Sequence, residues 1–178
     1  MNSIPPDLQL ETARCVLRAL DVIDAPFITA SLSDDAFGPA LRWDLPRDET
    51  ALVDALAASR EKWHTGTGYR FTIQLRATMR PVGCIALRHE PRARDWSIGF
   101  WIARSHWGQG YAVEAAAAVS EFAFTMLGAI VVRAAHAGRN QQSRRVIEKL
   151  GMRFKRQIVD DRGANGARLE FEYALERP

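Results

Sequence analysis

A turn with two glycines is the part of this sequence whose residue types best suit ligand chemistry. In the run RSHWGQGYAVEA (104–115), Gly108 and Gly110 flank Gln109 where a strand pattern gives way to a helical one. The first turn of a helix presents unpartnered backbone N–H groups and the positive end of the helix dipole. Glycine lets a ligand approach that backbone closely. The run therefore predicts an anion-binding turn suited to a diphosphate.

Two familiar nucleotide-binding motifs do not fit this turn. A dinucleotide-binding fingerprint requires a third small residue, where Val113 stands, and an acidic residue about 20 positions further on. The next strand pattern ends in HAGR (136–139), without an acid. A P-loop requires Gly-Lys-Ser/Thr after its glycines, which is also missing. A lone Gly-x-Gly pair also suits an ordinary turn, so the interpretation depends on the elements around it.

Composition places the chain among single-domain globular proteins. Its 178 residues are 47% hydrophobic and 25% charged, with a net charge of +3, and we expect one domain over 1–178. No apolar run reaches the roughly 18 residues that cross a bilayer, and the first residues lack an export-signal pattern. Cys15 and Cys84 stand alone in apolar runs, as buried reduced thiols do. We therefore expect a cytoplasmic domain with no metal site and no membrane contact.

Basic residues are concentrated in one part of the chain. Residues 133–168 hold 10 Lys/Arg against 3 Asp/Glu, a net of +7 that exceeds the charge of the whole chain. Such a concentration favours an anionic partner for the face that carries it. The stretch has no aromatic-interleaved RNA-binding motif, which argues against nucleic acid as that partner.

Hydrophobic periodicity predicts a mixed α+β architecture in which the turn joins a strand to a helix. Apolar alternation predicts strands at 10–20, 69–76, 81–88, 96–103, 129–136, 154–160 and 168–175. Capping residues ahead of helical spacing predict four helices, which begin after Asp21, Asp48, Gly110 and Asn140. One apolar stripe is expected on the helix of 110–127, formed by Tyr111, Ala115, Val119, Phe122 and Met126. The expected fold is one mixed sheet of about seven strands flanked by about four helices, with a strand–helix–strand crossover over 96–136.

Two separate blocks of the sequence point to a family. The run IGFWIARSHWGQGYAVEA (98–115), followed by NQQSRRVIEKLGMRF (140–154), resembles the GNAT N-acetyltransferase superfamily in its RimJ/RimL-like branch. The opening LETARCVLRAL and the order of elements extend this resemblance to nearly the whole chain. That branch acetylates protein N-terminal amines, notably those of ribosomal proteins. The resemblance implies a GNAT-like fold, acetyl-coenzyme A (acetyl-CoA) as donor and an amine as acceptor. It is also compatible with a homodimer, because dimers are common in the branch.

The resemblance also implies where the donor binds. Its diphosphate is expected on the backbone of the turn, at Trp107, Gly108, Gln109, Gly110, Tyr111 and Ala112. The strand before the turn is expected to splay from its neighbour and to pair with pantetheine at Ile102 and Ala103. The branch's Asn-x-x-Ser motif, which holds the pantetheine end and the thiol, matches Asn140 and Ser143. Basic residues of the same block are candidates to meet the phosphate charge, namely Arg139, Arg144, Arg145 and Lys149.

The expected chemistry is direct attack of a neutral amine on the thioester, without an acyl-enzyme. The resemblance implies that the Ile102 amide polarises the thioester carbonyl. Many relatives use a tyrosine as acid for the thiolate where Ile147 stands, so Ser143 is the expected substitute. Some relatives carry a glutamate where Ser97 stands, which leaves the general base open between His136, Glu170 and Glu90. His136 could act near neutral pH, whereas Glu114, which recurs in the branch's motif, is interpreted as a local partner of the helix dipole.

The acceptor is expected at the two early helices and the loop between them. Asp34, Trp43 and Asp44 supply acid and aromatic groups that suit a cationic amine, although a solvated acidic face explains them equally well. The leading hypothesis is acetyl transfer to a peptide or protein N-terminus. A small-molecule amine as acceptor and a CoA-binding sensor that lost catalysis stay open, and RNA or ribosome binding ranks last.

Overall fold

The computed structural model describes residues 4–33, 48–92, 94–160 and 168–177. Within them, eight strands form one mixed sheet in the order β1-β2-β3-β4-β5-β6-β8-β7. The strands are β1 Gln9–Glu11, β2 Cys15–Ala19, β3 Gly68–Leu75, β4 Pro81–His89, β5 Asp95–Ile102, β6 Val131–Ala137, β7 Arg153–Asp160 and β8 Arg168–Glu176. The helices are α1 Ala25–Leu32, α2 Glu49–His64, α3 Tyr111–Thr125 and α4 Gln141–Lys149. The predicted α+β class with a mixed sheet is confirmed, with eight strands rather than about seven. Among the described residues, no helix is long and apolar enough to cross a bilayer.

The predicted first strand, 10–20, is in fact two strands joined by a tight turn. β1 and β2 pair antiparallel, with Leu10 opposite Leu17. Thr12 interrupts the strand because its hydroxyl accepts a hydrogen bond from the Cys15 amide at 2.8 Å, while its own amide donates to the Cys15 carbonyl at 2.9 Å. Threonine hydroxyls often compete with sheet pairing in this way. The split puts Thr12 and Arg14 on a turn rather than inside a strand.

The helix starts follow the capping residues seen in the sequence. Asp21 caps a 3₁₀ turn, Val22–Asp24, that leads directly into α1. Asp48 accepts a hydrogen bond from the Ala51 amide at 2.9 Å, and Asn140 accepts one from the Ser143 amide at 3.0 Å. These bonds satisfy amides that the first helical turn leaves without partners.

The apolar stripe of α3 is confirmed except at its last member. Ala115, Val119 and Phe122 are buried, and Tyr111 is half-buried. Met126 is 59% exposed, so its predicted place in the stripe is wrong. The reason is that α3 ends at Thr125, which leaves Met126 as the C-cap, outside the helical spacing.

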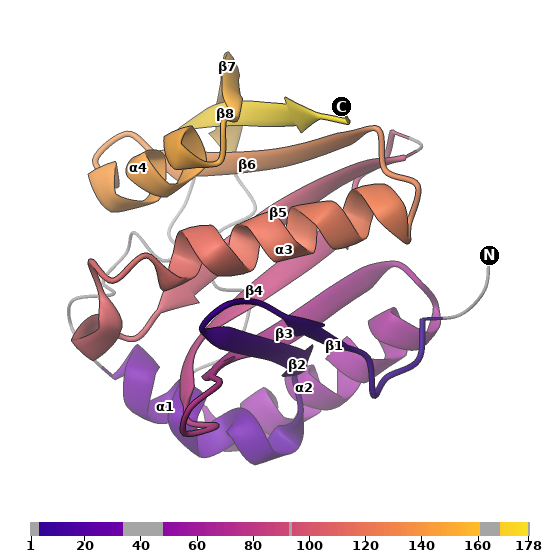
Figure 1. Cartoon of the computed structure of the whole chain (residues 1–178), viewed down its shortest axis with the longest axis vertical. Coiled ribbons are helices and arrows are strands. Elements are labelled where there is room, and N and C mark those ends of the chain that lie inside the picture. The colour runs from indigo at the N-terminus through magenta and orange to yellow at the C-terminus, as the bar shows by residue number, and fades with distance from the viewer. Residues whose placement is uncertain (1–3, 34–47, 93, 161–167, 178) are drawn as a thin grey trace.

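Two apolar clusters cover opposite faces of the sheet. α3 packs with Ile85 and Ile102 in the larger cluster, whereas α1 and α2 pack with Cys84 and Trp101 in the smaller one. Because neighbouring strand residues point to opposite faces, the Cys84–Ile85 and Trp101–Ile102 pairs separate the two faces. Figure 1 shows α3 crossing the sheet at β4 and β5, with α1 and α2 together at one end of the view and α4 beside β6.

A buried ion pair holds the start of α1 to the sheet. The Asp24 carboxylate is 2% exposed and accepts two hydrogen bonds from the Arg18 guanidinium, at 2.9 and 2.7 Å. It also accepts a hydrogen bond from the Thr72 hydroxyl at 2.7 Å and one from the Asp21 amide at 3.0 Å. One carboxylate therefore joins β2, β3 and the turn before α1.

The strands β5 and β6 pair only at one end. Their parallel pairing covers Asp95–Ser97 against Val131–Arg133, while β4 continues to pair with β5 as far as Ile102. From residue 98 to 102, the edge of β5 toward β6 is therefore left without that partner, over about 17 Å at 3.3 Å per residue. Figure 1 shows the two strands diverging toward the starts of α3 and α4. The predicted splay before the turn is confirmed.

We predict that neither cysteine reacts with a thiol reagent in the folded protein. Cys15 and Cys84 are both 0% exposed, and burial raises the pKa of each thiol, that of Cys84 well above its usual 9.0. The reactive species is the thiolate, which burial suppresses. Titration with Ellman's reagent should find two slow thiols in the native state and two fast ones in denaturant. One rapidly labelled thiol in the native state would contradict this packing.

Candidate functional site

The turn of residues 104–110 leaves the first amides of α3 open to a ligand. Gly108 and Gly110 have φ values of +75° and +83°, a region that glycine adopts without strain. Gly110 is the N-cap of α3 and, among the described residues, no side chain caps these amides. A Cβ atom built on Gly108 would meet nothing within 4 Å. The open backbone and the helix N-terminus together suit a diphosphate.

Glu114, on the first turns of α3, bonds to a distant part of the chain. Its Oε1 accepts hydrogen bonds from the Thr12 hydroxyl at 2.6 Å and from the Arg14 amide at 2.7 Å. Its Oε2 accepts a third from Arg14 Nε at 2.7 Å. The expectation that Glu114 bonds locally is therefore wrong, because α3 packs across the β1–β2 turn that carries both partners, about 100 positions away. We call Thr12, Arg14 and Glu114 the Glu114 clamp.

The Glu114 clamp extends to the glycine turn through Arg14. Its Nη1 donates a hydrogen bond to the Gln109 carbonyl at 2.9 Å, and its guanidinium lies 4.7 Å from the centre of the Tyr111 ring. A Cβ atom on Gly110 would come 3.4 Å from Nη2. In a trans peptide the carbonyl and the following N–H point in opposite directions. Holding the Gln109 carbonyl toward Arg14 therefore turns the Gly110 N–H away from it.

We predict that the Glu114 clamp stabilises the protein less as the pH falls. Partial burial raises the pKa of Glu114, but hydrogen bonds from Thr12 and Arg14 outweigh burial and lower that pKa below its usual 4.5. A carboxyl group with a lowered pKa in the folded state stabilises above its unfolded pKa, and this stabilisation is lost as the pH falls through the folded value. In thermal melts, the Tm deficit of Glu114→Gln should be present at pH 7 and shrink below about pH 4. A deficit that does not change with pH would contradict the prediction.

The two predicted pantetheine contacts at the end of β5, Ile102 and Ala103, differ in their backbone hydrogen bonds. The Ala103 amide donates to the Val82 carbonyl at 2.8 Å, and the Ala103 carbonyl accepts from the His106 amide at 2.8 Å. Strand-like pairing with pantetheine is therefore not open to Ala103. Amides alternate in direction along a strand, so the Ile102 amide points toward the gap beside β6. The Ile102 carbonyl accepts a hydrogen bond from the Trp107 indole at 2.6 Å, which ties the turn to the strand end.

The predicted residues of α4 lie on its first turn and its exposed side. Asn140 uses its side-chain oxygen to cap the helix, as described above. Ser143 is half-buried, and its hydroxyl has no hydrogen-bond partner in the described part of the chain. Arg145 and Lys149 are exposed one helical turn apart. Arg144 instead pairs with Glu148 at 2.8 Å on the same helix.

The three base candidates lie in different surroundings. His136 is 5% exposed, and its ring stacks on Phe171 with centroids 5.5 Å apart. Its Nδ1 lies 2.9 Å from the Ala137 carbonyl, whereas the buried Nε2 has no hydrogen-bond partner among the described residues. Glu170 is 1% exposed and, as the strand neighbour of Phe171, points to the other face. Glu90 is half-buried just beyond β4. A buried nitrogen without a protein partner, as at His136, is available for a water, a ligand or a proton transfer.

The predicted acceptor residues Asp34, Trp43 and Asp44 lie outside the described residues. Over 4–33, 48–92, 94–160 and 168–177, no three His, Cys, Asp or Glu side chains gather as a metal site would need. The residues that sequence reasoning missed are Thr12 and Arg14. In the sequence, these two residues were marked only by their place in the family-like opening LETARCVLRAL, which does not indicate what they bond to.

Comparisons with known proteins find sequence matches over most of the chain. The family model of the acetyltransferase (GNAT) domain matches residues 14–153. The uncharacterized N-acetyltransferase YoaA of Bacillus subtilis is 28% identical over 145 residues, which cover 80% of this chain and 81% of that relative.

Two solved structures share the fold. Mycobacterium smegmatis RimJ, solved with CoA-disulfide, has a TM-score of 0.81 at 22% identity over 96% of this chain and 88% of that one. The ribosomal-protein-S5-alanine acetyltransferase of Vibrio fischeri has a TM-score of 0.80 at 17% identity over 97% and 100%. Because the family model takes in the glycine turn, the open edge of β5 and α4, the chain belongs to the GNAT acetyltransferase family and is an N-acetyltransferase that uses acetyl-CoA.

Proposed function

We propose that this enzyme transfers the acetyl group of acetyl-CoA directly to the α-amine of a peptide or protein N-terminus. The observation that carries this proposal is that neither the unpaired length of β5, residues 98–102, nor Ser97 just before it has an acidic side chain. An α-amine has a pKa of about 7.7–8.0, whereas a lysine amine has one of about 10.4. An α-amine therefore needs a weaker base than a lysine does. The RimJ and ribosomal-protein acetyltransferase names of the two structures above support the same acceptor class.

The donor contacts follow the geometry of the turn and the strand. The diphosphate binds the amides of residues 108–112, with the Gly110 N–H turned toward it by the Glu114 clamp. The predicted contact at the Trp107 amide is not open, because that amide donates to the Arg104 carbonyl at 3.1 Å. Pantetheine extends along the open edge of β5, where the Ile102 amide donates to the thioester carbonyl. Charge that develops on that oxygen during attack is stabilised by such a pre-oriented donor. Arg145 and Lys149 meet the remaining phosphate charge from the exposed side of α4.

The reaction then needs two proton transfers. The amine nitrogen attacks the acetyl carbon, a tetrahedral intermediate forms, and the carbon–sulfur bond breaks as the new amide is made. The amine proton passes to a base, for which the unpartnered Nε2 of His136 and the buried carboxylate of Glu170 are the candidates. The departing thiolate takes a proton from the Ser143 hydroxyl, which has no competing partner among the described residues and regains its proton from solvent.

We predict that Ser143→Ala lowers kcat far more than it raises KM for acetyl-CoA. A general acid contributes about 10²–10⁴-fold to the rate, while the hydroxyl adds little to ground-state binding. Gln142→Ala, an exposed neighbour on α4, is the matched control and should keep the wild-type kcat. Equal losses in kcat and in donor affinity would refute the acid role, because the hydroxyl would then contribute to ground-state binding as much as to the chemical step.

A panel experiment tests the acceptor. Purified protein is incubated with acetyl-CoA and a set of N-terminal peptides, N-terminally blocked lysine peptides, polyamines and amino acids, and products are identified by mass spectrometry. The proposal expects acetylated N-termini with the blocked peptides untouched. Acetylation of small amines but of no peptide would move the acceptor to the small-molecule class. Tight acetyl-CoA binding without any turnover would support a sensor instead.

A further inference from the structure

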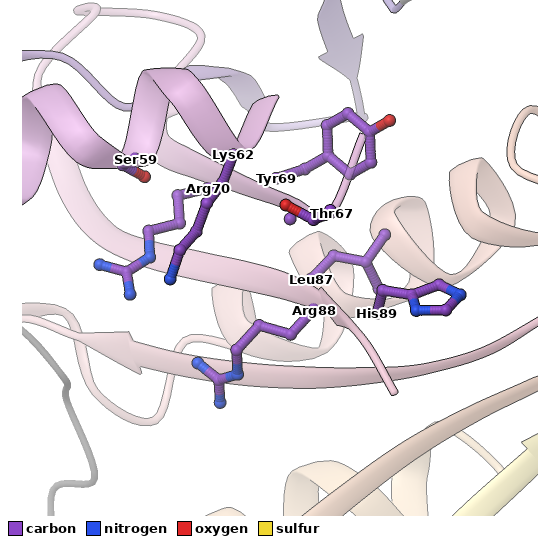
Figure 2. A pocket seen from close by; sticks show the side chains of 9 residues that line it. Ser59, Lys62, Thr67, Tyr69, Arg70, Leu87, Arg88 and His89 are labelled. Atoms are coloured by element: carbon purple, nitrogen blue, oxygen red, sulfur yellow. The ribbon is translucent and has the colours of Figure 1, made fainter. Parts of the chain in front are cut away.

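A pocket of about 280 Å³ lies beside the C-terminal half of α2, at the start of β3 and the end of β4. We call it the basic pocket. Its lining is dominated by polar and basic residues, which Figure 2 shows from close by: Ser59, Lys62, Thr67, Gly68, Tyr69, Arg70, Leu87, Arg88 and His89. The geometry and charge of this pocket carry an inference about the acceptor.

Three cationic side chains from three different elements converge on the basic pocket. Lys62 comes from α2, Arg70 from β3 and Arg88 from β4, and Figure 2 shows all three extending toward the same side. Since Arg70 pairs with Ala86 and Gly68 with Arg88, the two arginines are diagonal neighbours on adjacent strands, with Cα atoms about 7–8 Å apart. No described acidic residue belongs to the lining. Three cations on one side of a pocket attract an anionic group.

The absence of a side chain at Gly68 lets Lys62 approach β3 closely beside the basic pocket. Gly68 lies opposite Arg88, and a Cβ atom there would come 3.7 Å from Lys62 Cβ and 3.5 Å from the Leu87 carbonyl. The stem of Lys62 therefore packs directly over the start of β3. The hydroxyl groups of Ser59 and Thr67 add two neutral donors to the lining. Neutral donors beside cations suit a carboxylate or phosphate.

Arg88 links the basic pocket to the start of the open edge of β5. It lies opposite Ser97, the last residue of β5 that pairs with β6. Its Nη2 lies 3.0 Å from where a Cβ atom of Gly99 would stand, so the guanidinium covers the start of the open edge. The position is on the face of the sheet that α1 and α2 cover. An acceptor that approached the start of the open edge across this face would lie beside the basic pocket.

We propose that the basic pocket binds an anionic group of the acceptor itself, a carboxylate or phosphate carried close to the amine that is acetylated. For a peptide acceptor, this means an acidic residue next to the N-terminus. The inference rests on the proposed function. It requires that the three cationic side chains converge on one pocket, and it holds when any of them also has another partner. It differs from the expectation of an acidic acceptor surface, whose residues Asp34 and Asp44 lie outside the described residues.

Four peptides that differ at one position test the inference. They begin Ala-Glu, Ala-Gln, Ala-Lys and Ala-phosphoserine, and kcat/KM is measured for each at saturating acetyl-CoA. The Glu peptide should exceed the Lys peptide by about tenfold or more, and 0.5 M NaCl should shrink this ratio because it screens exposed charges. The phosphoserine peptide distinguishes phosphate from carboxylate as the preferred group.

Variants that change one charge of the basic pocket test whether the preference for the Glu peptide arises there. Lys62→Glu changes an exposed residue of α2 and should remove or invert the preference for the Glu peptide, with Arg70→Gln as a second variant. Lys155→Gln removes a lysine from an exposed strand outside the pocket and should keep the preference. Equal rates on the Glu, Gln and Lys peptides would overturn the inference and leave the proposed function intact. Acetylation of amino acids but of none of these peptides would instead exclude a peptide as acceptor. A comparison of amino acids with amines that lack a carboxylate or phosphate would then still test whether the pocket binds an anionic group.

Discussion

Arg14→Ala should weaken acetyl-CoA binding roughly tenfold or more, as small displacements of a positioned group can, with kcat at saturating donor unchanged. Arg14 touches none of the atoms that react. Its effect comes from the hydrogen bond to the Gln109 carbonyl, which turns the Gly110 N–H away from Arg14 and, in the proposed donor site, toward the diphosphate. Without that bond the peptide can rotate, and one donor of the turn then points away from the ligand. Titration calorimetry with acetyl-CoA measures the affinity directly.

A truncated donor separates positioning from general damage. Acetyl-pantetheine carries the same thioester without the nucleotide or its diphosphate, so Arg14→Ala should leave kcat/KM for this donor unchanged while lowering it for acetyl-CoA. Arg14→Lys should not restore affinity, because one ammonium cannot bond both Glu114 and Gln109 as a guanidinium fork does. Arg80→Ala is the matched control, since Arg80 is an exposed arginine on the turn between β3 and β4. Equal loss with both donors would reject the positioning role.

The elements that form the proposed donor site could be predicted because their signals are local. The glycines of the turn, the apolar stripe of α3 and the cap at Asn140 each act within a few residues of themselves. Hydrophobic spacing and capping chemistry decide such elements with little help from the rest of the chain. Met126, the one wrongly predicted member of that stripe, lies at the end of a helix. There a shift of one residue in the helix end decides whether a side chain is exposed.

The contacts that tune the site could not be predicted, because they join residues far apart in sequence. Glu114 carries the same residue type whether it faces solvent or Arg14, and the pairing appears only when α3 crosses the β1–β2 turn. The three cations of the basic pocket are spread over α2, β3 and β4, so no segment of the sequence looks basic there. The segment that does concentrate basic residues, 133–168, is a different part of the chain. Ala103 was likewise placed by analogy, while its backbone is used by Val82 and His106.

Asp24→Ala is expected to cause the largest loss of stability, about 3–5 kcal/mol, as removal of one partner of a buried ion pair does. The change leaves the Arg18 guanidinium without its bidentate partner and removes the acceptor of the Thr72 hydroxyl. For a domain of this size the Tm should fall by roughly 6–20 °C. Thermal and urea unfolding followed by circular dichroism measure both quantities.

Two companion variants test whether the loss comes from the buried charge. Asp21→Ala removes a more exposed aspartate of the same turn and should cost only about 0.5–2 kcal/mol, the usual effect of a helix cap. The double variant Arg18→Met with Asp24→Leu replaces both charges by apolar groups, and should be less destabilised than Asp24→Ala alone. Additive losses in the double variant would mean that the two residues stabilise the protein independently.

The same variants connect stability to the site, because the anchored turn starts α1. Phe27 of α1 stacks on Trp101 of β5 with ring centroids 5.5 Å apart, and Trp101 immediately precedes the proposed oxyanion donor, Ile102. Below its lowered Tm, Asp24→Ala should therefore lose kcat as well as stability, while Asp21→Ala should keep kcat. If Asp24→Ala lost stability but kept full kcat at a temperature where it is folded, the anchor would serve the fold alone and the position of Ile102 would depend on β4 and Trp107.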